Sequence, residues 1–316
     1  MAVTRPVLII AGPTASGKSS LAMDVAHEFS GTIINADSMQ VYRELRIVTA
    51  RPSEQDEAEI PHRLYGFQSA ADVFSAGHWV RLAVNEIKAA DKENRLPVVV
   101  GGTGLYLKAL LEGIVDVPDI PQPIREEVRA LHARWGAEQF HQELAKRDPA
   151  SAAKIPSSDP QRMLRAYEVF LATGKPLSVW QQEQPAPPLP DWAVASILVL
   201  PPRDLLYAAI DRRFEEMVEA GVIDEVAALA AIGLPADRPA LKALGIPELI
   251  GHSEGKIPLN QAVRKAQQAS RNYAKRQLTW FRNQFEQNYT LNAQYSDSHR
   301  EKIFSFIRNF LLTPPS

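Results

Sequence analysis

The chain has 316 residues, 45% of them hydrophobic and 23% charged, with a formal net charge of −2, which excludes a wholly disordered chain. It contains no cysteine, which excludes a disulfide framework, a thiolate nucleophile and a cysteine-ligated zinc site. No apolar run reaches the ~18 residues that a membrane-spanning helix needs, so we expect a cytoplasmic protein without a membrane partner.

The first predicted elements are a strand over residues 7–11, a loop over 12–17 and a helix over 18–28. The loop matches the pattern G-x-x-x-x-G-K-[ST], in which backbone N–H groups converge on phosphate oxygens at a helix N-terminus. Lys18 adds a positive charge, and the Ser19 hydroxyl can hold Mg²⁺. We therefore predict that the donor diphosphate or nucleotide binds to Gly12, Pro13, Thr14, Ala15, Ser16, Gly17, Lys18 and Ser19.

Two more polar clusters follow predicted strands. Asp37 comes after the strand 31–36, and its carboxylate could bind Mg²⁺, act as a general base or simply cap a helix. Thr103 lies in a glycine-rich turn after the buried strand 96–100. Such a turn can bring its backbone close to a ligand, or Thr103 can simply be a turn residue without a ligand. Strands that alternate with helices predict a parallel sheet, whose ligands bind beyond the carboxyl ends of the strands. We therefore expect the Gly12 loop, Asp37 with Ser38, and Thr103 to line one site.

Two proline-rich stretches, 117–123 and 185–190, bracket a helical pattern and are typical of stiff linkers. The predicted fold is α/β, with a P-loop NTPase-like parallel sheet flanked by helices and an all-helical insertion domain. Its first core segment is 1–116, the insertion is 117–184, and the second core segment, with basic C-terminal helices, is 185–316.

Inside the insertion, Asp159 and Pro160 predict the start of a helix that Gly174 and Pro176 end. Cations in the first turns of a helix are disfavoured by the helix dipole, so Arg162 and Arg165 suggest an external anion, although a solvated face explains them equally well.

The segment 261–285 carries cations and no acid. At ~100° per residue, four of them fall on one line along a helix, opposite Ala266, Ala269, Tyr273 and Trp280. The pattern predicts an aromatic core face and a nucleic-acid face, with a merely solvated face as the alternative. The aligned cations are Arg264, Arg271, Lys275 and Arg282. Earlier in the chain, either Arg212 or Arg213 could close over phosphates.

Taken together, these motifs resemble the tRNA dimethylallyltransferases, the bacterial isopentenyltransferases of tRNA. The matching segments occur in the family's order and span nearly the whole chain. A minor departure is 47–53, with Val48 and Arg51 where the family pattern has Gly and Lys. The matching segments are 12–19, 34–43, 101–107, 159–162, 173–178 and 273–282.

The resemblance implies transfer of a dimethylallyl group from dimethylallyl diphosphate to N6 of the adenosine 3′ of the anticodon. It assigns the proton-accepting base to Asp37, amine orientation to Thr103 and diphosphate binding to the P-loop with Mg²⁺ and Arg213. The expected partners are the donor and the tRNA anticodon stem-loop, and we expect a monomer. The implied tRNA contacts are Asp37, Ser38, Met39, Gln40, Thr103, Arg125, Gln161, Arg162, Met163, Leu164, Arg165, Arg271, Lys275 and Arg282.

Two other functions fit part of the pattern. A P-loop kinase of a small metabolite shares the loop and an aspartate after a strand, but it leaves the basic stripe and the helical insertion unexplained. A nucleotide-dependent RNA-binding switch explains the basic stripe but leaves Asp37 without a role.

Overall fold

The computed structural model describes residues 5–115, 117–183 and 185–313. The chain divides into two compact units, one formed by residues up to Leu111 and from Pro188 onward and the other by Glu112–Pro187. We refer to them as the core unit and the helical unit. The predicted insertion, 117–184, falls inside the helical unit. Residue 116, the predicted end of the first core segment, and residue 184, the predicted end of the insertion, lie outside the described residues.

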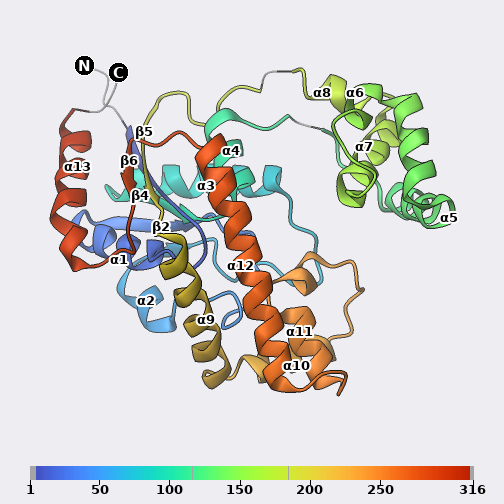
Figure 1. Ribbon diagram of the computed structural model, residues 1–316. Coiled ribbons are helices and arrows are strands. Elements are labelled where there is room, and N and C mark those ends of the chain that lie inside the picture. The colour runs from blue at the N-terminus through green and yellow to red at the C-terminus, as the bar shows by residue number, and fades with distance from the viewer. Residues whose placement is uncertain (1–4, 116, 184, 314–316) are drawn as a thin grey trace. The chain divides into compact units, whose positions relative to one another are not determined.

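A parallel sheet of six strands, counted over the described residues, forms the centre of the core unit (Figure 1). Its order is β3-β2-β4-β1-β5-β6, and Ile9 of β1 is in register with Val99 of β4 and Ser196 of β5. Continuous apolar runs such as residues 7–11 suit strands that are covered on both faces. The predicted α/β sheet is confirmed. The strands are β1 (Arg5–Ala11), β2 (Gly31–Asn35), β3 (His62–Arg63), β4 (Leu96–Gly101), β5 (Trp192–Val199) and β6 (Tyr289–Leu291).

The second core segment, predicted with basic C-terminal helices, also contains a strand, β6, which pairs in parallel with β5. This three-residue strand is too short to show the alternating pattern by which strands are predicted. Its position depends instead on Asn288, whose side-chain Oδ1 accepts a hydrogen bond from Ser196 N at 2.8 Å.

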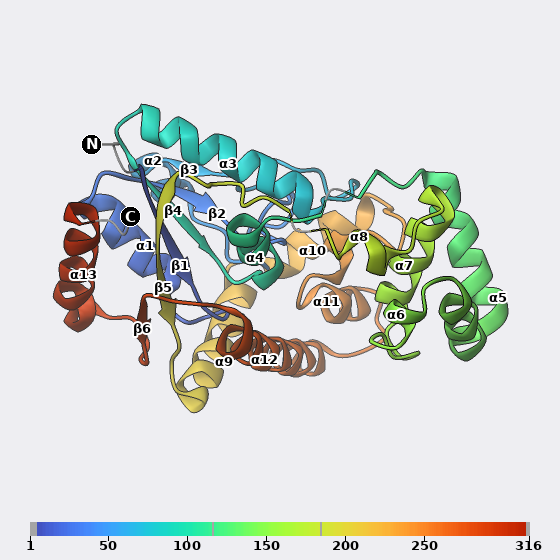
Figure 2. The ribbon, with the colours of Figure 1, turned by 90° about the horizontal axis from the view of Figure 1, so that it is seen from above.

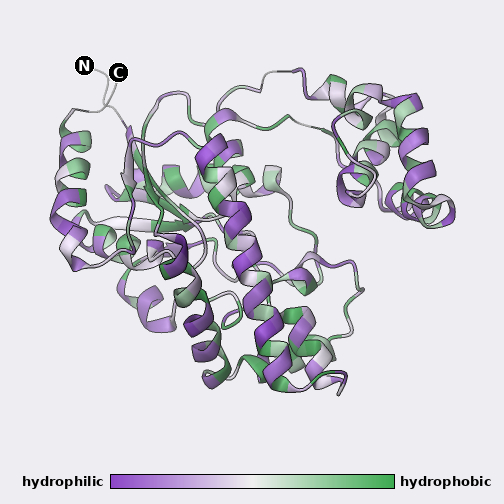
Figure 3. Cartoon of the chain, in the orientation of Figure 1, coloured by the Kyte–Doolittle hydropathy of each residue, from purple (hydrophilic) through white to green (hydrophobic). Residues whose placement is uncertain are grey.

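Helices cover both faces of the sheet (Figures 1 and 2). Because side chains alternate along a strand, Leu8 and Ile10 pack with α1 and α13, while Val7 and Ile9 pack with α3, α4 and the end of α12. Hydrophobic residues accordingly follow the central strands in Figure 3. The helices of the core unit are α1 (Lys18–Glu28), α2 (Glu54–Glu59), α3 (Ala76–Lys92), α4 (Gly104–Glu112), α9 (Arg203–Glu219), α10 (Val222–Ala231), η1 (Pro239–Lys242), α11 (Ile246–Ser253), α12 (Leu259–Gln284), η2 (Asp297–His299) and α13 (Arg300–Leu312).

A separate apolar cluster joins α9, α10, α11 and α12 to the irregular segment after β2. Within it, the Glu225 carboxylate of α10 accepts hydrogen bonds from three consecutive backbone N–H groups, those of residues 46–48, at 2.8–2.9 Å. The carboxylate thereby fixes the backbone that leads to Val48 and Thr49, which line the pocket described below.

The helical unit has its own small core, which includes Phe140, Met163 and Tyr167. The predicted helix start is confirmed, because the Asp159 side chain accepts a hydrogen bond from Arg162 N and Gly174 ends the helix with φ of 71°. The helices are α5 (Gln122–Arg147), α6 (Pro149–Ala152), α7 (Pro160–Thr173) and α8 (Leu177–Trp180). None of the helices in the described ranges is long and apolar enough to cross a membrane.

Candidate active site

Three loops that follow adjacent strands meet at the carboxyl edge of the sheet, as the topology predicts. They follow β1, β2 and β4, which are neighbours in the sheet. Ser38 N donates to Thr103 Oγ1 at 2.9 Å, and Thr103 N donates to Ala36 O at 3.2 Å. The segment after β2 and the turn after β4 are therefore bonded to each other directly.

The glycine loop bends sharply between β1 and α1. Ala15 and Gly17 both have positive φ, 60° and 89°, and Gly17 forms the N-cap of α1 without any side-chain cap. Without a capping side chain, the first N–H groups of α1 are available to an anion, which the helix dipole favours. The Ser16 hydroxyl is fully buried and has no hydrogen-bond partner within the described part of the chain.

Lys18 is held in this loop, where its Nζ donates to Pro13 O at 3.1 Å. Burial lowers the pKa of Lys18 to about 8; the nearby Asp37 carboxylate opposes this shift and the Arg213 guanidinium adds to it. A bound diphosphate would place negative charge beside the Lys18 ammonium group and would stabilise its charged form.

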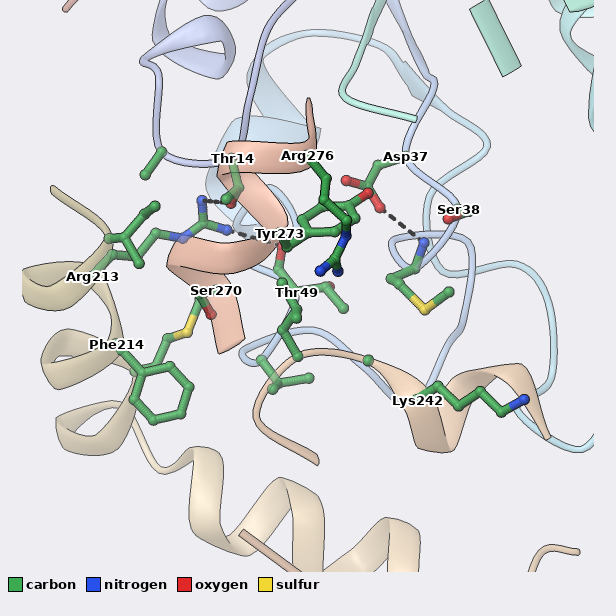
Figure 4. A pocket seen from close by; sticks show the side chains of 17 residues that line it. Thr14, Asp37, Ser38, Thr49, Arg213, Phe214, Lys242, Ser270, Tyr273 and Arg276 are labelled. Atoms are coloured by element: carbon green, nitrogen blue, oxygen red, sulfur yellow. Dashed lines mark hydrogen bonds between the residues drawn. The ribbon is translucent and has the colours of Figure 1, made fainter. Parts of the chain in front are cut away.

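Asp37 is oriented by its own neighbours. Its N–H donates to Asn35 Oδ1, and its Oδ1 accepts from Met39 N, both at 2.8 Å. No helix begins at Asp37 in the described structure, so the helix-cap interpretation does not apply. The carboxylate lines a pocket instead (Figure 4).

The pocket has a volume of about 280 Å³ and a lining of polar and apolar residues. Thr14 and Ala15 come from the glycine loop, and the apolar residues come mainly from the segment after β2, from α9 and from residues 243–244. Figure 4 shows Arg213 and Thr14 together, with Tyr273 and Arg276 near Asp37. The polar or charged lining residues are Thr14, Asp37, Ser38, Thr49, Arg213, Lys242, Ser270, Tyr273 and Arg276; the others are Ala15, Met39, Val48, Ile210, Phe214, Met217, Ala243 and Leu244.

The two candidate lid arginines have different surroundings. Arg213 lines the pocket, where it donates to Thr14 Oγ1 at 3.3 Å and to Thr49 O at 3.1 Å. Arg212 is 73% exposed and pairs with Glu216 on the helix surface. Arg213 is therefore the arginine next to the glycine loop.

The basic stripe on α12 needs two corrections. Arg271 has a counter-charge, because it forms an ion pair with Asp211 of α9, which lies far from it in sequence. The buried face of α12 is also rotated away from the predicted one and contains Gln267, Ser270 and Gln277. Polar side chains can be buried when they have hydrogen-bond partners. Tyr273 lies in the pocket instead of the core, and burial raises its pKa. The other three cations, Arg264, Lys275 and Arg282, are exposed.

The remaining predicted contacts have mixed surroundings. Met163 is fully buried in the core of the helical unit, so its side chain is not available to RNA. Gln40 uses its side-chain amide to donate to Thr49 O and Ala50 O. Arg125 Nε donates to Ile120 O, and Arg162 pairs with its own N-cap, Asp159. Gln161 is exposed, whereas Leu164 and Arg165 are half-buried.

Several pocket residues are absent from the predicted site. Thr49, Ser270, Tyr273 and Arg276 line the pocket, and Gln277 lies behind it, bonded to Thr14 N. Residues 273–277 fall within a matching segment of the family pattern, which could have identified them. No pattern within α9 marks Phe214 or Met217 as pocket walls.

Comparisons with known proteins identify the family of the chain. A family model described as IPP transferase matches residues 40–284. The protein named tRNA dimethylallyltransferase from Rhodospirillum centenum is 55% identical over 90% of this chain and 90% of its own length. Its namesake from Parvibaculum lavamentivorans is 49% identical over 98% of both chains.

Solved structures share the fold over nearly the whole chain. The tRNA isopentenylpyrophosphate transferase of Bacillus halodurans superimposes with a TM-score of 0.69 at 32% identity, over 98% of this chain and 97% of that one. A eukaryotic dimethylallyltransferase acting on tRNA gives a TM-score of 0.83 at 24% identity, over 99% of this chain and 81% of that one. The chain therefore belongs to the IPP transferase family, whose members named above are tRNA dimethylallyltransferases.

Proposed function

We propose that the protein transfers a dimethylallyl group from dimethylallyl diphosphate to N6 of the adenosine 3′ of the anticodon in tRNA, releasing diphosphate. The observation that carries the proposal is the pocket, in which a phosphate-binding loop, a carboxylate and an apolar wall meet. Family membership supports the reaction class. The tRNA substrate makes the cytoplasm the expected compartment, and we propose that the enzyme acts as a monomer.

The diphosphate of the donor would bind beside the glycine loop. The N–H groups at the start of α1, Lys18 and Arg213 would contact its oxygens, while the apolar residues of the pocket would accommodate the five-carbon group. As the bond between C1 and oxygen breaks, negative charge grows on the leaving diphosphate. Cations and N–H groups fixed beforehand at that position stabilise this charge without reorganisation.

The acceptor amine needs a base because its lone pair is delocalised into the adenine ring. In the proposed step N6 bonds to C1 of the donor and gives up one proton to the Asp37 carboxylate. Asp37 is suited to this role because, among the described residues, one of its carboxylate oxygens accepts a hydrogen bond from Met39 N and the other accepts none. Thr103 Oγ1, held by Ser38 N, would orient the amine. The base must leave its stack to reach these groups.

Mg²⁺ fits this site as an ion that arrives with the substrate. In the described residues no three or more His, Cys, Asp or Glu side chains are grouped to hold a metal. Mg²⁺ usually binds substrate phosphates, water and one or two protein oxygens. The exposed Ser19 hydroxyl in the first turn of α1 would supply one such oxygen. The ion would neutralise charge on the diphosphate.

We propose that tRNA is held by two sets of residues. One set, in the core unit, is Ser38, Met39, Lys275 and Arg282; Arg271 contributes less because it is already paired. The other set, in the helical unit, is Arg125, Gln161, Arg162, Leu164 and Arg165. Arginine and lysine would bind phosphates in both sets, and this contribution weakens with salt.

Mass analysis of nucleosides from unmodified tRNA, after incubation with enzyme, Mg²⁺ and donor, tests the proposal. The expected product is N6-dimethylallyl adenosine with an equal amount of diphosphate. A parallel reaction with ATP and no prenyl donor should leave both RNA and ATP unchanged. ATP consumption with unmodified RNA would favour a kinase or a nucleotide switch instead.

A further inference from the structure

A buried amide on α12 connects the two loops of the proposed site. Gln277 is 6% exposed; its Oε1 accepts a hydrogen bond from Thr14 N and its Nε2 donates to Gly102 O, both at 2.9 Å. Thr14 belongs to the phosphate loop, and Gly102 precedes Thr103. The two backbone groups are far apart in sequence from Gln277 and are joined through one side chain.

The chemistry of the partners fixes the orientation of this amide. A backbone N–H can only donate and a carbonyl can only accept, so the oxygen of Gln277 must face Thr14 and its nitrogen must face Gly102. A neutral side chain of this length with a donor and an acceptor at its tip is found only in glutamine. Methionine fills a similar volume without either bond, whereas glutamate keeps the acceptor and loses the donor.

The loops are packed as closely as their backbones allow. A Cβ added at Gly102 would lie 2.4 Å from Gln277 Nε2 and 2.9 Å from Gly12 O. A Cβ added at Gly104 would lie 2.5 Å from the Trp280 ring. Helix α12 therefore contacts the turn on both sides of Thr103, through Gln277 and Trp280.

We propose that Gln277 is a positioning residue that sets the phosphate loop and the Thr103 turn at a fixed separation, so that donor carbon and acceptor nitrogen are aligned. The proposed alignment of carbon and nitrogen rests on the proposed prenyl transfer. The proposed effect of Gln277 on the phosphate loop can be tested without that reaction, because inorganic diphosphate can bind to the loop without any transfer. Small displacements of reacting groups cost large factors in rate, so the effect should appear in kcat as well as in affinity.

The test compares Gln277→Met with Gln267→Met. Gln267 is a second buried amide on α12, with Nε2 donating to Asp211 O of α9, and it does not line the pocket. We expect Gln277→Met to lower kcat at least about tenfold and to weaken Mg²⁺-diphosphate binding in calorimetry, while Gln267→Met leaves both within about twofold. Equal kcat and equal diphosphate affinity in the two variants would overturn the proposal. If the wild type binds diphosphate but transfers nothing, the proposed function fails, and the diphosphate comparison still decides the role of Gln277.

Gln277→Glu provides a readout that general loss of packing would not change. A protonated carboxyl has one donor and one acceptor, so it can restore both bonds at low pH. The ratio of variant to wild-type kcat should therefore rise as pH falls from about 8 to about 5.5, because burial raises the pKa of a carboxyl group. A ratio that stays flat overturns the proposal, even if the methionine variants fold poorly.

Discussion

Buried polar groups have different consequences in the two units. In the core unit Gln277 and Arg213 join segments that are distant in sequence, and each side chain forms one hydrogen bond with Thr14 of the glycine loop. In the helical unit the buried carboxylate of Asp148 accepts hydrogen bonds from the backbone N–H and hydroxyl groups of Ser151 and Ser178. The first set joins segments at the proposed site, whereas the second joins α6 to α8. We therefore expect a buried polar group to affect activity only when its partners lie at the site.

The largest expected effect on kcat comes from replacing Asp37 in the core unit. We expect Asp37→Ala to lower kcat by ~10²–10⁴-fold, the usual contribution of a general base. Its melting temperature and tRNA affinity should stay near those of the wild type, because the hydrogen bonds of Asp37 within the described residues are to the loop around it. Single-turnover kinetics and a filter-binding assay measure the two quantities. Transfer at a near wild-type rate would remove Asp37 as the base.

The opposite behaviour is expected of Asp148. Asp148→Ala leaves several buried donors without an acceptor, which should destabilise the helical unit by about 3 kcal/mol. Chemical denaturation followed by the fluorescence of Trp135 and Trp180 would report this change. Diphosphate affinity, which depends on the core unit, should not change. A variant with reduced diphosphate affinity and unchanged stability would reverse the comparison.

Two neighbouring arginines on α9 allow a pocket residue to be compared with a surface residue within the core unit. Arg213→Ala should lower kcat by ~10²-fold, because it removes a charge next to the leaving group. Arg212→Ala should stay within about twofold, since an exposed ion pair contributes little. Steady-state kinetics with saturating tRNA measures both variants, and equal losses would contradict the assignment of Arg213.

The pKa of Lys18 predicts a pH dependence of diphosphate binding. Burial places that pKa at about 8, below its usual value, so the free protein loses the lysine charge as pH rises through 8. The Kd for diphosphate should rise about tenfold per pH unit above this point. Lys18→Arg should remove the dependence, because a guanidinium stays charged. Calorimetry at several pH values tests this, and parallel curves for wild type and variant would contradict it.

The smallest effect is expected on the exposed face of α12. Lys275→Ala and Arg282→Ala should each reduce the salt slope of tRNA binding by ~1, as loss of one phosphate contact does. Arg271→Ala should reduce it less, because Arg271 pairs with Asp211. Affinities measured over a range of salt concentrations distinguish the three variants. Equal slopes for all three would mean that the ion pair opens on binding.

Local features of this chain were predictable from sequence, and distant contacts were not. The bounds of α1 and the cap of α7 follow from neighbouring residues, and the sheet edge that collects Asp37 and Thr103 follows from topology. The burial of Gln277 depends on partners 263 and 175 positions away. The helical pattern predicts Tyr273 in the core because it sorts residues by polarity alone. Polarity does not show which polar side chains will form hydrogen bonds and become buried.

The central claim is that the glycine loop binds the diphosphate of a prenyl donor. Calorimetric titration of the purified protein with dimethylallyl diphosphate and with ATP, both with Mg²⁺, tests it most directly. We predict saturable binding of dimethylallyl diphosphate that Lys18→Ala weakens at least about tenfold, and much weaker binding of ATP. Tight binding of ATP without detectable binding of the prenyl donor would contradict the claim.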